Sequence, residues 1–119
     1  MALGPTHWDV DLDIRVAANE VVRRFGGSWN TYEGHGLWPA RGERRTVDFW
    51  ESPGRGATLD EGRGDAIVAW VLGQHQVKPV AVLIWWSWWW RPGYGWQPYP
   101  GLHGNHGPGP DAHVHVGWQ

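Results

Sequence analysis

Apolar residues recur at three- and four-residue spacing in two segments of the chain, which predicts two amphipathic helices. The first segment runs from Asp9 to Phe25, begins with aspartates, ends with arginines and is followed by two glycines. Acidic residues at the start and basic residues at the end complement the helix macrodipole, and glycines commonly end helices. The second segment runs from Asp65 to Gln74, behind a predicted loop over residues 51–64. The apolar positions are Ile14, Ala18, Val21, Val22 and Phe25 in the first helix and Ile67, Val68, Val71 and Leu72 in the second.

Other segments have the patterns of β-strands. In residues 44–50, Val47 and Phe49 are predicted to face one side of a strand and Asp48, between them, the other side. The continuous apolar and β-branched run Val77–Trp86 is typical of a central strand. The predicted strands are residues 28–32, 44–50, 77–86 and 113–118.

Two segments between the last predicted strands are unusual in composition. Residues 91–112 hold six Gly and five Pro in 22 positions, so we expect a long loop there without a regular element. The stretch Trp85–Trp90 before it has five Trp in six positions. Either its alternate rings fill the core and cover a sheet face, or they form the wall of a cleft.

These elements together predict an α+β fold, in which a small antiparallel sheet is backed by two helices. A chain of 119 residues can build one modest hydrophobic core, so we expect one domain over residues 1–119. Residues 1–27 are interpreted as an N-terminal helical segment of this domain. Residues 28–118 are interpreted as the core that carries the candidate site.

Composition and charge exclude several classes of protein. The chain has no cysteine, which excludes disulfides and thiolate metal sites, and its net charge of −2 predicts no nucleic-acid-binding surface. The longest apolar run, Val80–Trp86, is far shorter than the ~20 residues of a membrane span. The N-terminus lacks the basic and apolar regions of a signal peptide. We therefore expect a protein made in the cytoplasm, without a membrane span, and we expect it to be a monomer.

Residues that could bind a metal or take part in catalysis lie at three places in the sequence. His113 and His115 are two residues apart in a predicted strand, so both imidazoles project from the same face, about 6.6 Å apart at Cα. Asp48 lies between apolar residues, where a carboxylate needs a cation or a metal as its partner. His35 lies between two glycines that allow a tight turn. Two imidazoles and one carboxylate can hold catalytic zinc with an open fourth position. The alternative is that the His-Val-His spacing is coincidental, that His35 is an ordinary loop residue and that Asp48 pairs with Arg44, Arg45 or Arg91.

The twelve Trp of the chain suggest a binding surface in addition to a core. Trp88, Trp90 and Trp96 could stack on a glycan or pack on a peptide, and Arg91 could pair with a carboxylate of the same ligand. His106, in the predicted loop, is interpreted as an exposed residue that reaches the His113 region only if the loop folds back. Sequence motifs of other familiar hydrolases and nucleotide-binding proteins are absent.

The order of these motifs resembles a known group of enzymes. A histidine follows the Asn30–Tyr32 turn, then come Thr46–Trp50, Ile84–Trp85, the Gly95–Tyr99 segment and finally Asp111–Val116 with its His-Val-His sequence. This series is similar to the hedgehog/D-Ala-D-Ala peptidase-like domains, which are common in actinobacteria and their phages. The resemblance runs from about residue 28 to residue 118.

The resemblance implies a zinc ion held by His35, Asp48 and His115, with His113 as the residue that accepts a proton. Carboxypeptidases of the group carry a glutamate three residues before the last histidine. Because Ala112 stands at that position, the base would be His113 or Asp111, and the resemblance favours the branch with the His-x-His motif.

The expected function is therefore that of a zinc metallopeptidase, a hydrolase that cuts stem peptides of bacterial peptidoglycan in the manner of an endolysin. Such a chain would reach the cell wall by phage delivery or by release. The alternative is a non-catalytic peptidoglycan- or glycan-binding module, or a phage structural protein, that uses the Trp-rich surface. The two differ in whether wall material is cut or only bound.

Overall fold

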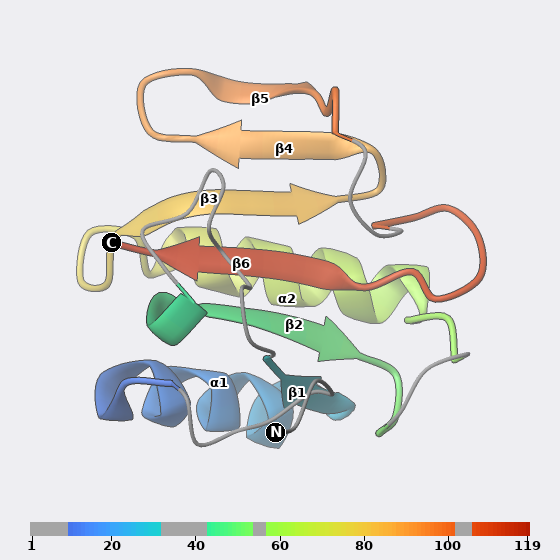
Figure 1. Ribbon diagram of the computed structural model, residues 1–119, viewed down its shortest axis with the longest axis horizontal. Coiled ribbons are helices and arrows are strands. Elements are labelled where there is room, and N and C mark those ends of the chain that lie inside the picture. Colours follow the sequence, from blue (N-terminus) through green and yellow to red (C-terminus); the bar gives the residue numbers. More distant parts are fainter. Residues whose placement is uncertain (1–9, 32–42, 54–56, 102–105) are drawn as a thin grey trace.

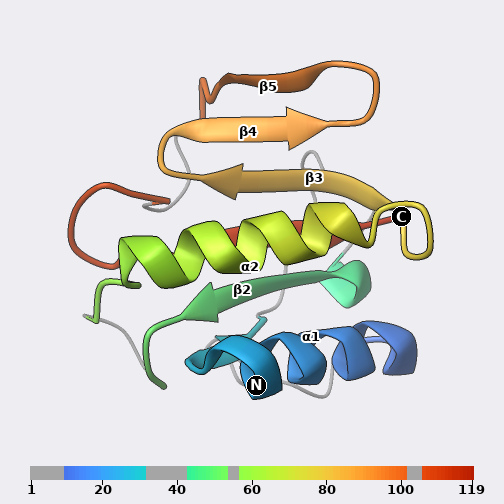
Figure 2. The same cartoon turned by 180° about the vertical axis from the view of Figure 1, so that it is seen from behind.

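The computed structural model of the protein describes residues 10–31, 43–53, 57–101 and 106–119. It has a six-stranded antiparallel sheet with the strand order β1-β2-β6-β3-β4-β5 and two helices, so the predicted α+β class is confirmed. Both helices cover the same face of the sheet, as Figures 1 and 2 show from opposite sides. The elements are α1 (Leu12–Phe25), β1 (Ser28–Asn30), a 3₁₀ turn (Glu43–Arg45), β2 (Thr46–Trp50), α2 (Glu61–Gly73), β3 (Val80–Trp85), β4 (Trp88–Arg91), β5 (Gly95–Pro98) and β6 (Val114–Trp118). No helix in these described ranges is long and apolar enough to cross a membrane.

The C-terminal strand β6 lies in the middle of the sheet, between β2 and β3 (Figure 1). Asp48 of β2 and Ile84 of β3 are both register partners of His115. Residues directly opposite each other in an antiparallel sheet project from the same face. The register therefore decides which side chains from distant parts of the chain meet.

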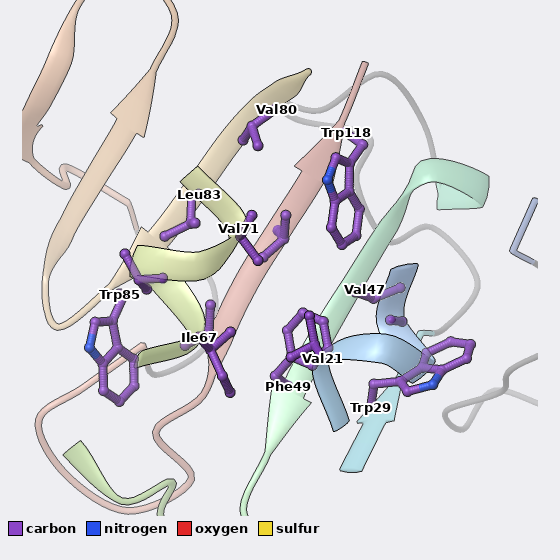
Figure 3. Close-up of a cluster of buried hydrophobic side chains, with 14 of the residues drawn as sticks. Val21, Trp29, Val47, Phe49, Ile67, Val71, Val80, Leu83, Trp85 and Trp118 are labelled. Carbon is purple, nitrogen blue, oxygen red and sulfur yellow. The ribbon is translucent and has the colours of Figure 1, made fainter. Parts of the chain in front are cut away.

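The hydrophobic core lies between the sheet and the two helices (Figure 3). Val47 and Phe49 of β2 face this side, as their alternation with Asp48 predicts. Residues of α1, α2, β2, β3 and β6 contribute to one cluster of buried side chains. Its members include Ile14, Ala18, Val21, Val47, Phe49, Ile67, Val71, Leu83, Val114, Val116 and Trp118.

Several elements differ from the prediction, helix α2 and strand β5 among them. Helix α2 begins at Glu61, before the predicted start at Asp65, because Asp60 caps it by accepting a hydrogen bond from the backbone N–H of Arg63. Residues 95–98, predicted to be loop, form β5 at the edge of the sheet. An edge strand tolerates Gly95 at its start and Pro98 at its end, since its outer side has no strand to pair with. The prediction of an unbroken loop over residues 91–112 was therefore wrong.

At Gly64, helix α2 packs directly against the ring of Trp85. A Cβ added there would lie 2.2 Å from a ring carbon of Trp85, a buried side chain beside α2 in Figure 3. We expect Gly64→Ala to lower the free energy of unfolding by about 1–3 kcal/mol because the overlap outweighs the better helix propensity of alanine. Urea unfolding measures the difference.

Gly73, at the end of the same helix, has no atom within 4 Å of an added Cβ and provides the matched control. Gly73→Ala should leave stability unchanged or raise it by up to about 1 kcal/mol. Equal stabilities of the two variants would contradict the close packing of α2 on Trp85.

A charged network joins the start of α1 to the 3₁₀ turn and to the residues before β3. Asp13 accepts hydrogen bonds from Arg45 and from Lys78, and Asp11 accepts them from Arg44 and Arg45. The hydrogen bonds from Arg45 and Lys78 hold the pKa of Asp13 well below its ordinary value. The hydrogen bond from Arg44 likewise lowers the pKa of Asp11.

A carboxyl group whose pKa is lower in the folded chain stabilises the fold above its unfolded pKa, and this contribution is lost as the pH falls. We therefore expect Asp13→Asn to lower the Tm at neutral pH and the difference from wild type to shrink below about pH 4, where the unfolded carboxyl becomes protonated. Thermal unfolding of both proteins as a function of pH measures this. A difference that stays constant down to low pH would contradict the assignment.

Candidate functional site

The candidate site lies on the face of the sheet opposite the helices. Asp48 of β2 and His115 of β6 are register partners, and His115 Nδ1 lies 3.2 Å from Asp48 Oδ1. Both side chains are buried, with exposed fractions of 2% for Asp48 and 7% for His115. The fold therefore brings together Asp48 and His115, two of the three residues that the resemblance implies as zinc ligands.

His113 joins this pair from the segment that leads into β6. Its Nε2 lies 3.7 Å from Asp48 Oδ1, and its Nδ1–H donates to the backbone carbonyl of Asp111 at 2.9 Å. That hydrogen bond fixes the neutral tautomer, so the lone pair is on Nε2. The ring also stacks on Trp50 with centroids 4.2 Å apart. His113 thus has a fixed orientation, with its basic nitrogen toward the carboxylate.

Trp50 is itself held in place by β1. Its indole N–H donates to the side-chain oxygen of Asn30 at 2.8 Å, and both residues are buried. Asn30 is the register partner of Asp48. Strand β1, which pairs with β2 next to Asp48, therefore fixes the Trp50 ring that stacks on His113.

His106 is a fourth member of the cluster. Its ring centroid lies 4.6 Å from that of His113 and 5.7 Å from that of His115, and the residue is 7% exposed. The interpretation of His106 as an exposed loop residue does not hold in the fold, where the segment carrying it lies against the site. Three imidazoles and one carboxylate thus gather in one buried place; His103, the other histidine of the predicted loop, lies outside the described residues.

The turn between β3 and β4 holds His106 against the site. The backbone N–H of Trp86 donates to the carbonyl of His106, and the Ser87 hydroxyl donates to the carbonyl of Gly107 at 2.8 Å. Ser87 also accepts a hydrogen bond from the backbone of Tyr99, whose ring packs edge-on against His106 with centroids 5.5 Å apart. This turn therefore holds His106 beside His113 and His115, and it holds Tyr99 against His106.

Histidines lie next to the buried carboxylate of Asp48. The three arginines weighed as partners for it make their contacts elsewhere: Arg44 and Arg45 bind aspartates near the start of α1, and Arg91 donates to Gln97. A carboxylate removed from water costs several kcal/mol without a compensating charge or hydrogen bonds. Protonation of an imidazole or a bound cation can supply that charge.

The chemistry of the donor set suits zinc. Ligands of a tetrahedral zinc ion lie about 3.3 Å apart when each is about 2.0–2.1 Å from the metal. The separation of 3.2 Å between Asp48 Oδ1 and His115 Nδ1 is close to this value. No group of three or more His, Asp or Glu side chains in the described ranges is arranged to hold a metal ion. His35, the third ligand implied by the resemblance, lies outside those ranges.

The four residues proposed to bind substrate are divided between the two faces of the sheet. Trp90 and Trp96 are register partners in a row that continues through Leu83 and Val116, which belong to the core on the helix side. Trp88 is the partner of Trp85 and shares that side. Arg91, two residues from Trp89, lies over the Trp89 ring at 3.9 Å, on the side of Asp48 and His115.

The three tryptophans therefore do not line the histidine cluster. Of the four residues proposed for substrate binding, the structure brings only Arg91 to the face that carries the cluster. Comparisons of the chain with models of protein families, with curated proteins and with solved structures found no match.

Proposed function

We propose that this protein is a zinc-dependent peptidase that hydrolyses stem peptides of bacterial peptidoglycan. The observation that carries the proposal is the pairing of buried Asp48 with His115 across neighbouring strands, with His113 fixed beside them. The similarity of the motif order to the hedgehog/D-Ala-D-Ala peptidase-like domains supplies the substrate class.

Asp48 and His115 are assigned as two protein ligands, and His35 as the third. Zinc with three protein ligands polarises a carbonyl and lowers the pKa of a bound water to about 7. Asp48 brings the negative charge that offsets part of the charge of the cation, and its position in the sheet keeps it next to His115.

His113 is assigned as the residue that accepts and returns a proton. A general base needs a free lone pair, and the Asp111 carbonyl leaves Nε2 of His113 unprotonated in the neutral ring. The stacked Trp50 ring excludes water from one side of the imidazole and limits its rotation. His106 lies against both other imidazoles, so it narrows the access to the cluster.

The first test is the zinc content of the wild-type protein, measured by elemental analysis after purification without added metal. We expect about one zinc per chain, as for a mononuclear site with three protein ligands. The same protein should release new amino groups from purified peptidoglycan, and a chelator should stop the release. Protein that takes up no zinc even when zinc is offered would overturn the proposal. Binding to peptidoglycan without release of amino groups would favour the alternative of a non-catalytic binding module.

A further inference from the structure

A second candidate site lies on the helix side of the sheet, away from the histidine cluster. A groove of about 410 Å³ runs between α2 and the β3–β4–β5 part of the sheet, the part that stands beyond α2 in Figure 2. Four indoles contribute to its wall: Trp85, Trp86, Trp88 and Trp96. Trp88 and Trp96 are 47% and 42% exposed, so two large rings remain open to a ligand.

The ionisable side chain that lines the groove is acidic. Asp65 of α2 contributes a carboxylate, and its Oδ1 accepts a hydrogen bond from the Trp85 indole N–H at 2.9 Å. The remaining wall from α2 is aliphatic, and no basic side chain lines the groove among the described residues. A negative group beside four indole side chains, of which Trp88 and Trp96 are well exposed, creates a favourable environment for a cation when no positive group lines the described wall.

Indole is the best aromatic partner for a cation, because the face of its ring carries partial negative charge. A primary ammonium is strongly hydrated, and it would lose that hydration in a groove that offers few hydrogen-bond acceptors. An alkylated ammonium holds water less tightly, and its methyl groups can contact both the indoles and the aliphatic side chains of α2. The chemistry of the wall therefore favours alkylated over unmodified amines.

A neutral sugar fits the same wall less well. Each hydroxyl turned toward the groove needs a hydrogen-bond partner, or its desolvation is not compensated. The polar side-chain groups of the described wall are the Asp65 carboxylate and the indole N–H groups, and the N–H of Trp85 already donates to Asp65. We propose that the groove between α2 and strands β3–β5 binds an alkylated ammonium group, held by Trp88, Trp96 and Asp65. This site is independent of the proposed peptidase site, which lies on the other face of the sheet.

The test titrates the ¹⁵N-labelled full chain with choline at constant ionic strength and follows the indole N–H signals by NMR. Choline should shift the signals of Trp88 and Trp96 to saturation, and leave that of Trp118, in the core, unchanged. The neutral isostere 3,3-dimethylbutan-1-ol has the same shape without the charge. We expect it to bind at least about tenfold more weakly, because it lacks the cation–π and ionic contacts.

Two variants separate the ionic from the aromatic contribution. Asp65→Asn keeps an oxygen for the Trp85 N–H but removes the charge, and it should weaken choline binding by about tenfold. Trp96→Ala removes an exposed ring from an edge strand and should abolish saturable binding without unfolding the chain. Glu61→Gln, a loss of one exposed charge on the same helix but outside the groove, should bind choline like the wild type.

Equal affinity for choline and its neutral isostere would overturn the proposal, and so would unchanged binding by Asp65→Asn. A chito-oligosaccharide that shifts the same indole signals while choline does not would also overturn it, and would identify the groove as a saccharide platform. Loss of zinc from the other face leaves these outcomes unaffected, so failure here and failure of the peptidase proposal are distinguishable.

Discussion

His115→Ala is expected to lose bound zinc and peptidase activity together. The imidazole is one of three assigned ligands, and its Nδ1 lies beside Asp48 Oδ1 at 3.2 Å. Removal of an outer-shell partner of a zinc site already costs 10–100-fold in affinity or activity, so loss of a direct ligand should weaken zinc binding by more than about 100-fold. Elemental analysis of protein purified without added metal, followed by zinc titration against a chromophoric chelator, measures the loss.

This variant also leaves Asp48 buried beside a cavity, which can cost about 3–5 kcal/mol of stability. Asp48→Asn tests the same site with less disturbance, since the amide has the size of the carboxylate and can still bond to His115. It should also lose zinc while remaining folded by circular dichroism. His75→Gln removes an imidazole that packs on Trp90, outside the cluster, and should keep full zinc content. Zinc at the wild-type level in folded His115→Ala or Asp48→Asn would contradict the ligand assignment.

The sequence predicted the central part of the fold well because the signals there are local. The alternation of Val47 and Phe49 with Asp48 depends only on the two-residue period of a strand, and the buried faces follow it. The continuous apolar run before Trp85 likewise predicted a strand in the middle of the sheet, where both faces are covered. The pairing of Asp48 with His115 was implied by the resemblance, and the register of β2 with β6 produces it.

The Trp-rich segment could not be assigned to faces from its sequence. Trp86 and Ser87 form a two-residue turn with positive φ at both positions, a conformation for which hairpins normally use Asn or Gly. Without those residues the turn has no sequence signal, so the sequence left open whether the rings alternate along one strand or form the wall of a cleft. The turn restarts the alternation, so that Trp88 and Trp90 face the helices and Trp89 faces the histidines.

The position of His106 was equally hidden, because it depends on two hydrogen bonds to that same turn rather than on a local pattern. A Gly- and Pro-rich segment predicts the absence of a helix, but its composition does not predict which part of the fold the segment packs against. The tight contact of Gly107 with the Trp86 ring offers one signal in retrospect. A Cβ on Gly107 would lie 2.4 Å from a ring carbon, so the close approach requires glycine there.

His113→Ala is expected to keep zinc but to lower turnover by about 10²–10⁴-fold, the usual contribution of a positioned general base. The expectation rests on the free Nε2 of His113, which faces Asp48 while Nδ1–H is bound to the Asp111 carbonyl. Zinc content and the rate of amino-group release from peptidoglycan, measured on one preparation, separate the two roles. Loss of both together would assign His113 as a ligand.

The Asp111 side chain is the competing candidate for the base, and Asp111→Asn decides between them. In this fold the backbone carbonyl of Asp111 orients His113, and asparagine keeps that carbonyl and tolerates the positive φ of 61° at this position. Asp111→Asn should therefore turn over substrate at nearly the wild-type rate. If the Asp111 carboxylate were the base, this variant would lose most of its activity. A slow Asp111→Asn beside a fast His113→Ala would move the proton transfer from the imidazole to the carboxylate. A fast Asp111→Asn beside a slow His113→Ala would assign the imidazole as the base. Its orientation would then come from the backbone carbonyl of residue 111 and from the stacked ring of Trp50.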